Sequence, residues 1–274
     1  MSYNFSGRYN ICYLDFQLKQ SFLLFSSTKI SEYPAWHTNG KKLTFYSEID
    51  GDRELYNIDI NGQNLTRLTF SPGIDEDPNW SPDGNFLVFS SDRGHPKKQN
   101  LVIMNQATGS FVEISSGGGR NTVPKWSPDS KTIVFSTDRF WPGWDVGILE
   151  LATRSERFLT SGILSYCRAN YFKKKNAIVY SKGASKSVDL YELDMTNSKE
   201  SLILGLSGRE YDVEVLSDDK SLFFVHESSP GGNDFQLYFY DLGEKERKQI
   251  TSSIIPANNL KSEGQIRYLS WIEK

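Results

Sequence analysis

The stretch Pro78-Asn-Trp-Ser-Pro-Asp-Gly84 decides the fold of this chain, because it recurs at a nearly fixed interval. A close copy is Pro124-Lys-Trp-Ser-Pro-Asp-Ser130, and a more distant one is Pro34-Ala-Trp-His-Thr-Asn-Gly40. The tryptophans of the three copies are 44 and 46 residues apart. Continuing this interval gives six anchors, near residues 36, 80, 126, 171, 215 and 260. A period of this length indicates a repeat protein in which each repeat is one structural unit.

Each repeat has the pattern of four short strands. Apolar runs such as Phe86–Phe89 and Leu222–Val225 follow the anchors and have apolar side chains at adjacent as well as alternate positions, which predicts strands covered on both faces. The third segment of each repeat ends in an acid or amide that suits the start of a tight turn, at Asp15, Asp59, Asn105, Glu150, Asp194 and Asp241. We therefore predict an all-β fold, a six-bladed β-propeller with four-stranded antiparallel blades, and one domain over residues 1–274.

The two ends of the chain are expected to share the sixth blade. After the last anchor, one apolar segment remains at 266–272, and two further strand-like segments stand at the other end, at 11–15 and 21–25. We predict that the blade is split two plus two between the termini, which would close the ring and remove open sheet edges.

Composition narrows the possible partners. The chain has 31 basic and 34 acidic residues, a net charge of −3, and therefore no basic excess for a nucleic-acid backbone. Two distant cysteines exclude a disulfide scaffold. No apolar run approaches the length of a membrane span, and residues 1–8 have no apolar signal core. These features predict a soluble protein without nucleic-acid binding, placed in the cytoplasm, or in the periplasm if a leader was removed.

The candidate site consists of polar residues just before the anchors. They are expected on connections between blades, around the mouth of the central channel, where propellers bind ligands. Two more candidates, Trp141 and Trp144, stand on the loop 139–145. They either pack inward over the blade or, if exposed, form an aromatic platform for a sugar ring or a contact for a protein partner. The candidates before the anchors are Glu32, Tyr33, Asp75, Glu76, Asp77, Arg120, Asn121, Tyr166, Arg168, Arg209, Glu210, Tyr211, Asp212 and Asn258.

Two interpretations of this mouth stay open. In the functional one, Arg120, Arg168 and Arg209 bind a carboxylate or phosphate while the acids orient an amine or hydroxyls. In the structural one, these charges are solvated or pair between neighbouring blades. No pattern in the sequence requires a cofactor.

A metal site is not predicted, because the three histidines belong to different repeats. His37 follows an anchor, whereas His95 and His226 are expected after second strands, at the opposite rim. No catalytic motif with a nucleophile, histidine and acid is recognisable either. The sequence thus names no catalytic residue.

The segments Pro78 to Arg93 and Pro124 to Arg139 resemble the repeat of TolB-type β-propellers. That family includes the periplasmic protein TolB and the propeller domains of prolyl-oligopeptidase-like enzymes, and oligogalacturonate lyases carry a related motif. The resemblance implies a non-catalytic propeller that binds a protein, a peptide or a small polar or acidic ligand at the channel mouth. The alternative is a carbohydrate-active enzyme, a lyase, hydrolase or isomerase, that uses the acids and arginines of the same mouth. A bound metal or perturbed pKa values of the mouth acids would favour the enzyme.

Overall fold

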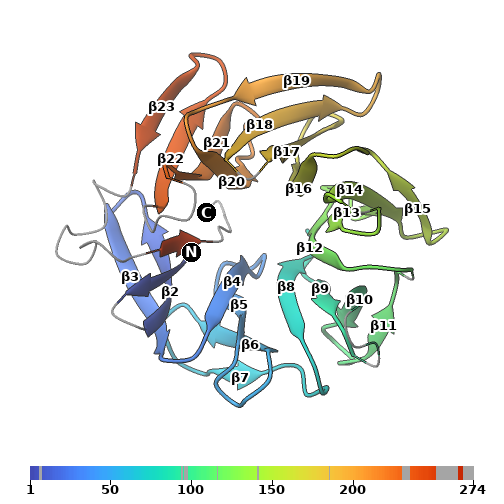
Figure 1. Ribbon diagram of the computed structural model, residues 1–274. Coiled ribbons are helices and arrows are strands. Elements are labelled where there is room, and N and C mark those ends of the chain that lie inside the picture. Colours follow the sequence, from blue (N-terminus) through green and yellow to red (C-terminus); the bar gives the residue numbers. More distant parts are fainter. Residues whose placement is uncertain are drawn as a thin grey trace.

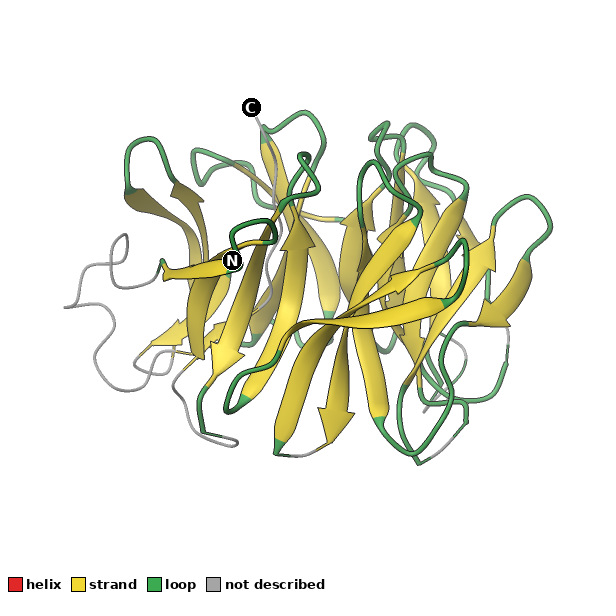
Figure 2. Ribbon diagram, turned by 90° about the horizontal axis from the view of Figure 1, so that it is seen from above, coloured by secondary structure: helices red, strands yellow, loops and turns green. Residues whose placement is uncertain are grey.

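The computed structural model of the protein describes residues 1–5, 8–93, 95, 98–115, 117–140, 142–184, 186–229, 235–250 and 265–267. The regular structure in these ranges consists of strands β1 to β24, which form short sheets arranged around a centre (Figure 1). Seen from the side, the strands run between two rims of loops (Figure 2). Among the described residues there is no helix of the length and apolarity that a membrane span needs.

Five sets of four consecutive strands form the blades. Blade 1 contains β4 (Ser31–Trp36), β5 (Lys42–Ser47), β6 (Glu54–Asp59) and β7 (Thr66–Arg67). Blade 2 contains β8 (Asp75–Trp80), β9 (Phe86–Ser91), β10 (Asn100–Asn105) and β11 (Phe111–Glu113). Blade 3 contains β12 (Asn121–Trp126), β13 (Thr132–Thr137), β14 (Asp145–Glu150) and β15 (Ser155–Phe158).

The next two blades are joined. Blade 4 contains β16 (Ser165–Tyr171), β17 (Ala177–Ala184), β18 (Ser187–Asp194) and β19 (Lys199–Leu204). Blade 5 contains β20 (Arg209–Val215), β21 (Ser221–Glu227), β22 (Phe235–Asp241) and β23 (Glu246–Gln249). A single parallel pairing, Val188 with Arg209, links them into one eight-stranded sheet. Within each blade, sequential strands pair antiparallel, as predicted.

A further sheet, the terminal sheet, combines both ends of the chain in the order β24 (Gln265–Arg267), β1 (Ser2–Phe5), β2 (Arg8–Asp15) and β3 (Gln20–Ser27). The predicted partnership of residues 266–272 with 11–15 is wrong for the described part, because β1 lies between them: Ser2 pairs with Arg267 on one side and with Ile11 on the other. Strand β1 was missed because its sequence, Ser-Tyr-Asn-Phe, has no apolar run. The sixth anchor, residue 260, lies outside the described residues.

The predicted anchors mark the ends of the innermost strands. Trp36, Trp80, Trp126, Tyr171 and Val215 are the last residues of β4, β8, β12, β16 and β20, the strands nearest the centre in Figure 1. The third-segment acids and amides are likewise the last residues of β2, β6, β10, β14, β18 and β22. At Asn105 the side-chain oxygen accepts hydrogen bonds from the backbone N–H groups of Ala107 and Thr108, so the predicted turn chemistry is confirmed.

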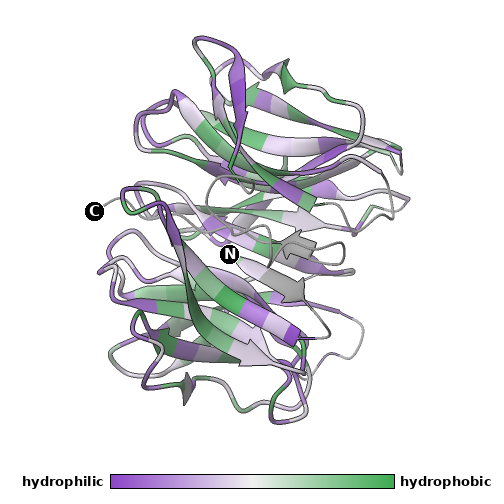
Figure 3. Ribbon diagram, turned by 90° about the vertical axis from the view of Figure 1, so that its left-hand side faces the viewer, coloured by the Kyte–Doolittle hydropathy of each residue, from purple (hydrophilic) through white to green (hydrophobic). Residues whose placement is uncertain are grey.

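The core lies between neighbouring blades. Trp80 of blade 2 packs with Ala35, Tyr46 and Leu55 of blade 1. Its indole N–H also donates a 2.8 Å hydrogen bond to the Thr44 hydroxyl of that blade. Hydrophobic residues are concentrated in the strands, and many of the connecting loops are hydrophilic (Figure 3). The second-strand aromatics are fully buried, namely Phe45, Phe89, Phe135, Tyr180 and Phe224.

Candidate functional site

Every inner strand of the five blades is interrupted at the same repeat position. The residue three places before the anchor has a left-handed backbone, with φ between 51° and 57°. At this point the pairing with the second strand shifts register, which marks a β-bulge. A non-glycine residue in this conformation is uncommon, and such strain gathers at binding sites. The five residues, named here the bulge residues, are Tyr33, Asp77, Val123, Arg168 and Asp212.

All five bulge residues line one partly open cavity of about 40 Å³ between the inner strands. The apolar part of the cavity wall consists of Pro34, Pro78, Pro124 and Val213. Lys125 and Glu214, each directly before an anchor, complete the lining. We call this space the channel cavity.

Asp77 is an acid of this cavity with one oxygen that has no hydrogen-bond partner among the described residues. It is only 5% exposed, and its Oδ2 accepts a 2.9 Å hydrogen bond from the backbone N–H of Val123. Its Oδ1 is buried and has no hydrogen-bond partner within the described part of the chain. Burial, with a smaller contribution from the charge of Glu76, raises the pKa of Asp77 to about 8. The group is therefore largely protonated at neutral pH when the cavity holds no cation.

The other charges of the cavity are arranged in pairs that join blades. Arg168 of blade 4 forms an ion pair with Asp212 of blade 5. Lys125 Nζ of blade 3 lies 2.5 Å from Glu214 Oε1 of blade 5, across the centre of the fold. The second oxygen of Glu214 accepts a 3.0 Å hydrogen bond from the Asn170 amide. These pairs hold the inner strands together, and the two charges of each pair neutralise each other.

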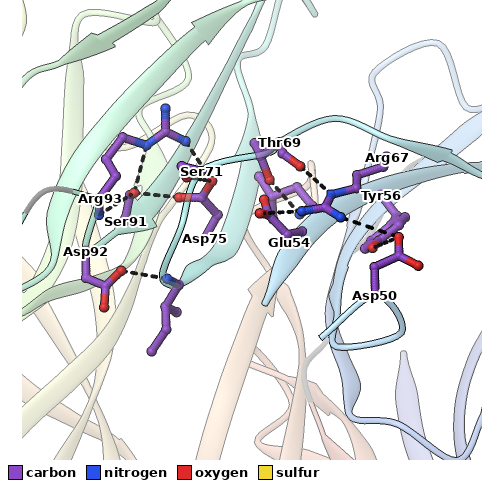
Figure 4. Close-up of polar contacts among 12 residues, drawn as sticks. Asp50, Glu54, Tyr56, Arg67, Thr69, Ser71, Asp75, Ser91, Asp92 and Arg93 are labelled. Atoms are coloured by element: carbon purple, nitrogen blue, oxygen red, sulfur yellow. Dashed lines mark hydrogen bonds and ion pairs between the residues drawn. The ribbon is translucent and has the colours of Figure 1, made fainter. Parts of the chain in front are cut away.

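The two acids before Asp77 do not line the cavity: Asp75 has its partners in blade 2 and in the connection before it, and Glu76 joins blades 1 and 2. Asp75 is enclosed by Ser71, Ser91 and Arg93, with a 2.6 Å contact to the Arg93 guanidinium (Figure 4). Glu76 contacts Arg53 of blade 1 at 2.7 Å and accepts a 2.7 Å hydrogen bond from the Gln99 amide. A similar cluster around Arg67 ties together the outer strands of blade 1 (Figure 4). Both acids thus hold neighbouring strands in place.

The three arginines expected to converge do not. Arg120 lies 2.7 Å from Asp138 of its own blade and stacks over the Trp144 ring at 4.8 Å. Arg209 likewise pairs with an acid of its own blade, Glu227, at 3.4 Å. Only Arg168 lines the channel cavity. The predicted three-arginine clamp for an anion is therefore not formed.

The remaining candidates take part in packing within blades. Glu32 accepts a 2.8 Å hydrogen bond from the Tyr46 hydroxyl, and Tyr211 donates one to Glu227 at 3.0 Å. Three further candidates also have contacts in the structure: Asn121 lies beside Ser115, Tyr166 packs against Tyr180, and Glu210 lies beside His226.

The candidates before the anchors were expected on connections between blades, and this location is wrong. Nearly all of them stand in inner strands, and Arg120 directly precedes the inner strand β12. Trp141 and Asn258 lie outside the described residues.

Sequence reasoning missed several residues of the cavity. Lys125 and Glu214 stand one residue before an anchor, and the bulge residues three before it, so both sets share a spacing of two along the strand. The β-bulge lies between these two positions and interrupts the regular alternation of side chains. Alternation along the strand therefore gave no signal for Lys125 and Glu214.

The histidines are separate, as their repeats predict. His37 contacts Gln106 at 3.2 Å, His95 lies near Glu113, and His226 contacts Glu210 at 2.8 Å. His226 stands inside the second strand β21 rather than after it. Among the described residues no group of three or more potential metal ligands was found.

Radial four-stranded sheets with inner strands around a lined cavity define this protein as a β-propeller. The family model of the TolB beta propeller domain matches residues 5–167. The chain belongs to this family.

Individual relatives give the extent of the similarity. The Tol-Pal system protein TolB of Francisella tularensis subsp. holarctica is 35% identical over 82 residues, 30% of this chain and 19% of that protein. The crystal structure of TolB from Acinetobacter baumannii has a TM-score of 0.79 at 17% identity, with 94% of this chain and 61% of that chain covered. An oligogalacturonate lyase in complex with manganese has a TM-score of 0.62 at 16% identity, with 88% and 71% covered. At these identities the structural similarity shows the fold alone.

Proposed function

We propose that this chain is a non-catalytic TolB-like propeller that binds a protein segment, a peptide or a small polar ligand at the channel cavity. The observation that carries the proposal is that the bulge residues of all five blades line one cavity. Each such conformation costs about 1–3 kcal/mol, and strain of this kind clusters at ligand-binding sites. The charged lining suits a polar ligand rather than an apolar one.

A protein ligand is the class we favour. The relatives in the comparison are named for the Tol-Pal system, an assembly of proteins, although the matched stretch covers only 19% of the first of them. The sequence left two compartments open, the cytoplasm and the periplasm. The similarity to TolB favours the periplasm and does not support the cytoplasm.

We further propose that the terminal sheet is a sixth blade and that it closes the ring. Its order, β24-β1-β2-β3, has the four strands of a blade, and β1 pairs with strands from both ends of the chain. A closed ring would hold the inner strands at fixed distances around the channel cavity. The geometry of the cavity then depends on this sheet.

The second candidate, an enzyme acting on a carbohydrate in the cavity, is favoured by one observation. The raised pKa of Asp77 is typical of a group that donates a proton in catalysis. A direct test is incubation with digalacturonate and Mn²⁺, with chromatography of the products. Turnover that Asp77→Asn abolishes would replace the binding proposal by the enzymatic one.

Obstruction of the cavity tests the binding proposal. A thermal-shift and NMR screen with tripeptides, amines, sugar acids and inorganic phosphate is compared between the wild type and Val123→Phe, which narrows the cavity. The matched control is Val112→Phe on the outer strand β11, where the side chain is 44% exposed. We expect ligands that bind the wild type and the control but not Val123→Phe. Equal binding to all three proteins would place the ligand elsewhere and refute the proposal.

A further inference from the structure

The charges of the channel cavity leave one group uncompensated. Its lining contains two cations, Lys125 and Arg168, and three acids, Asp77, Asp212 and Glu214. Each cation contacts one of the last two acids, and Asp77 forms no ion pair within the described part of the chain, where the charge of Arg168 only partly offsets the effect of burial on its pKa. A buried carboxylate without a counter-charge is costly, and it either protonates or recruits a cation.

The hydrogen bonds of Asp77 point in the same direction. Oδ2 accepts the Val123 N–H at 2.9 Å and lies 3.5 Å from the Ser90 hydroxyl. Oδ1 is buried and unpartnered among the residues that the structure describes. A buried oxygen without a hydrogen-bond partner is rare in native proteins and is explained by a bound water, ion or ligand group. When Asp77 is ionised, such a group supplies an N–H or O–H donor to Oδ1.

We propose that the channel cavity binds a primary ammonium group, with the Asp77 carboxylate as its acceptor. This inference rests on the proposed function and specifies its ligand. An ammonium supplies both the missing donor and the missing positive charge. It is also more compact than the planar guanidinium. The carbon stem of such a group can pack against the apolar rings of Pro34, Pro78 and Pro124, which line the cavity.

The ammonium has two sources in proteins, a lysine side chain and a chain amino-terminus. Both present the same donor, but only lysine brings a flexible four-carbon stem. The probes therefore separate them: Nα-acetyl-lysine methylamide carries only the side-chain ammonium, and alaninamide only the terminal one. Nα,Nε-diacetyl-lysine methylamide has the stem without the charge and is the negative control.

Binding of an ammonium requires ionised Asp77, so the affinity depends on pH. Below the raised pKa of Asp77, binding of the cation displaces the proton of the carboxyl, and the affinity rises as the pH increases from 6 to 8. The charged or titratable groups around Asp77 are Glu76 on its own strand, Lys125 on β12, Arg168 on β16, Asp212 and Glu214 on β20, and Tyr33 on β4.

The test is calorimetric titration of the whole chain with the three probes at pH 6, 7 and 8, in two buffers of different ionisation enthalpy. We expect one of the charged probes to bind, the diacetylated probe to bind at least about tenfold more weakly, and protons to be released at pH 7. Asp77→Asn should lose at least about tenfold in affinity. The matched control is Asp145→Asn, a buried aspartate of blade 3 outside the cavity, which should bind as the wild type does.

Failure of this inference is distinguishable from failure of the proposed function. If neither charged probe binds, or if both bind Asp77→Asn as tightly as the wild type, the ammonium site is refuted. If in addition no compound of the wider screen distinguishes Val123→Phe from the wild type, the proposed function fails as well. The wild-type pH dependence provides a readout even if Asp77→Asn is poorly folded: an affinity independent of pH between 6 and 8 contradicts the role of Asp77.

Discussion

The carboxylate of Asp77 in blade 2 accepts a hydrogen bond from the backbone N–H of Val123 in blade 3, and both residues have left-handed backbones. Two strained residues of neighbouring inner strands are thus tied to each other. One blade further, the hydroxyl of Ser136 in blade 3 accepts a 2.9 Å hydrogen bond from the backbone N–H of Arg168, the bulge residue of blade 4. The bulges are part of the contact between blades, and they also shape the channel cavity.

The first prediction concerns the pH dependence of Asp77→Asn. The folded protein holds a proton on Asp77 up to about pH 8, whereas an unfolded aspartate releases it near pH 4 (roughly 3.9). Stability conferred by the protonated group is therefore fully present below about pH 4 and is lost as the pH rises towards 8. The melting temperature of Asp77→Asn minus that of the wild type should increase from pH 5 to 8 and then level off. A difference that stays constant over this range would show that Asp77 is already ionised.

The second prediction concerns the ion pair between Arg168 and Asp212. The two side chains are 25% and 9% exposed, so Arg168→Ala leaves a largely buried acid without its partner. We expect the free energy of unfolding to fall by about 1–3 kcal/mol. Arg120→Ala is the control, because that side chain is 49% exposed, and it should cost about 0–1 kcal/mol. Denaturant unfolding measures both, and equal effects would mean that the pair is not buried in solution.

The third prediction tests the packing between blades 1 and 2. Trp80→Ala removes a buried indole and its hydrogen bond to Thr44, which should lower the free energy of unfolding by about 3–5 kcal/mol. Phe70→Ala is the control, since that ring is 73% exposed, and it should cost at most about 1 kcal/mol through its contact with Arg67. The prediction is checked by urea titration followed by fluorescence of the other tryptophans. A loss below about 1 kcal/mol for Trp80→Ala would contradict the packing described.

The fourth prediction concerns the terminal sheet. In β1, Tyr3 pairs with Ile266 on one side and Asn10 on the other, so a proline there would disturb a strand with neighbours on both sides. Tyr3→Pro should lower the melting temperature and promote association through the exposed edge, whereas Tyr3→Phe keeps the backbone donor and should do neither. Calorimetry and size-exclusion chromatography report the two effects. Unchanged behaviour of Tyr3→Pro would argue against closure of the ring by both termini.

The fifth prediction concerns the thiols, both of which are free. Cys12 is 1% exposed, and burial raises its pKa to about 11. At pH 8 only about 0.1% of such a thiol is the reactive thiolate. In the variant Cys167→Ser, Cys12 should therefore react with a thiol reagent only as the protein unfolds. Modification within minutes under native conditions would show that β2 opens locally.

The repeat made the strands predictable because its signals are local. Turn residues such as Pro82 and Gly84, and the tryptophan before them, specify where one strand ends and the next begins. The alternation and clustering of apolar residues then locate the second strands, as the complete burial of Phe89 confirms. Strand β1 lacks these signals, and its place between β2 and β24 follows only from pairing with distant residues.

The candidate site was predicted only in part, because its composition depends on backbone conformation. Asp75, Glu76 and Asp77 are adjacent acids with no difference in sequence that separates their roles. The bulge at Asp77 interrupts the regular alternation of side chains, so that this acid lines the cavity, while Asp75 pairs within blade 2 and Glu76 joins blades 1 and 2. No residue preference would predict a left-handed conformation at Tyr33 or Val123.

The sequence by itself determined the repeat, the strand ends and the propeller class, because these rest on interactions between residues close together in the chain. The tertiary structure alone decided which charges meet. Lys125 and Glu214 are 89 positions apart, and Arg168 and Asp212 are 44 apart, yet each pair is in contact. Such pairs form only when the fold brings different blades together, and they leave Asp77 as the acid of the cavity that forms no ion pair among the described residues.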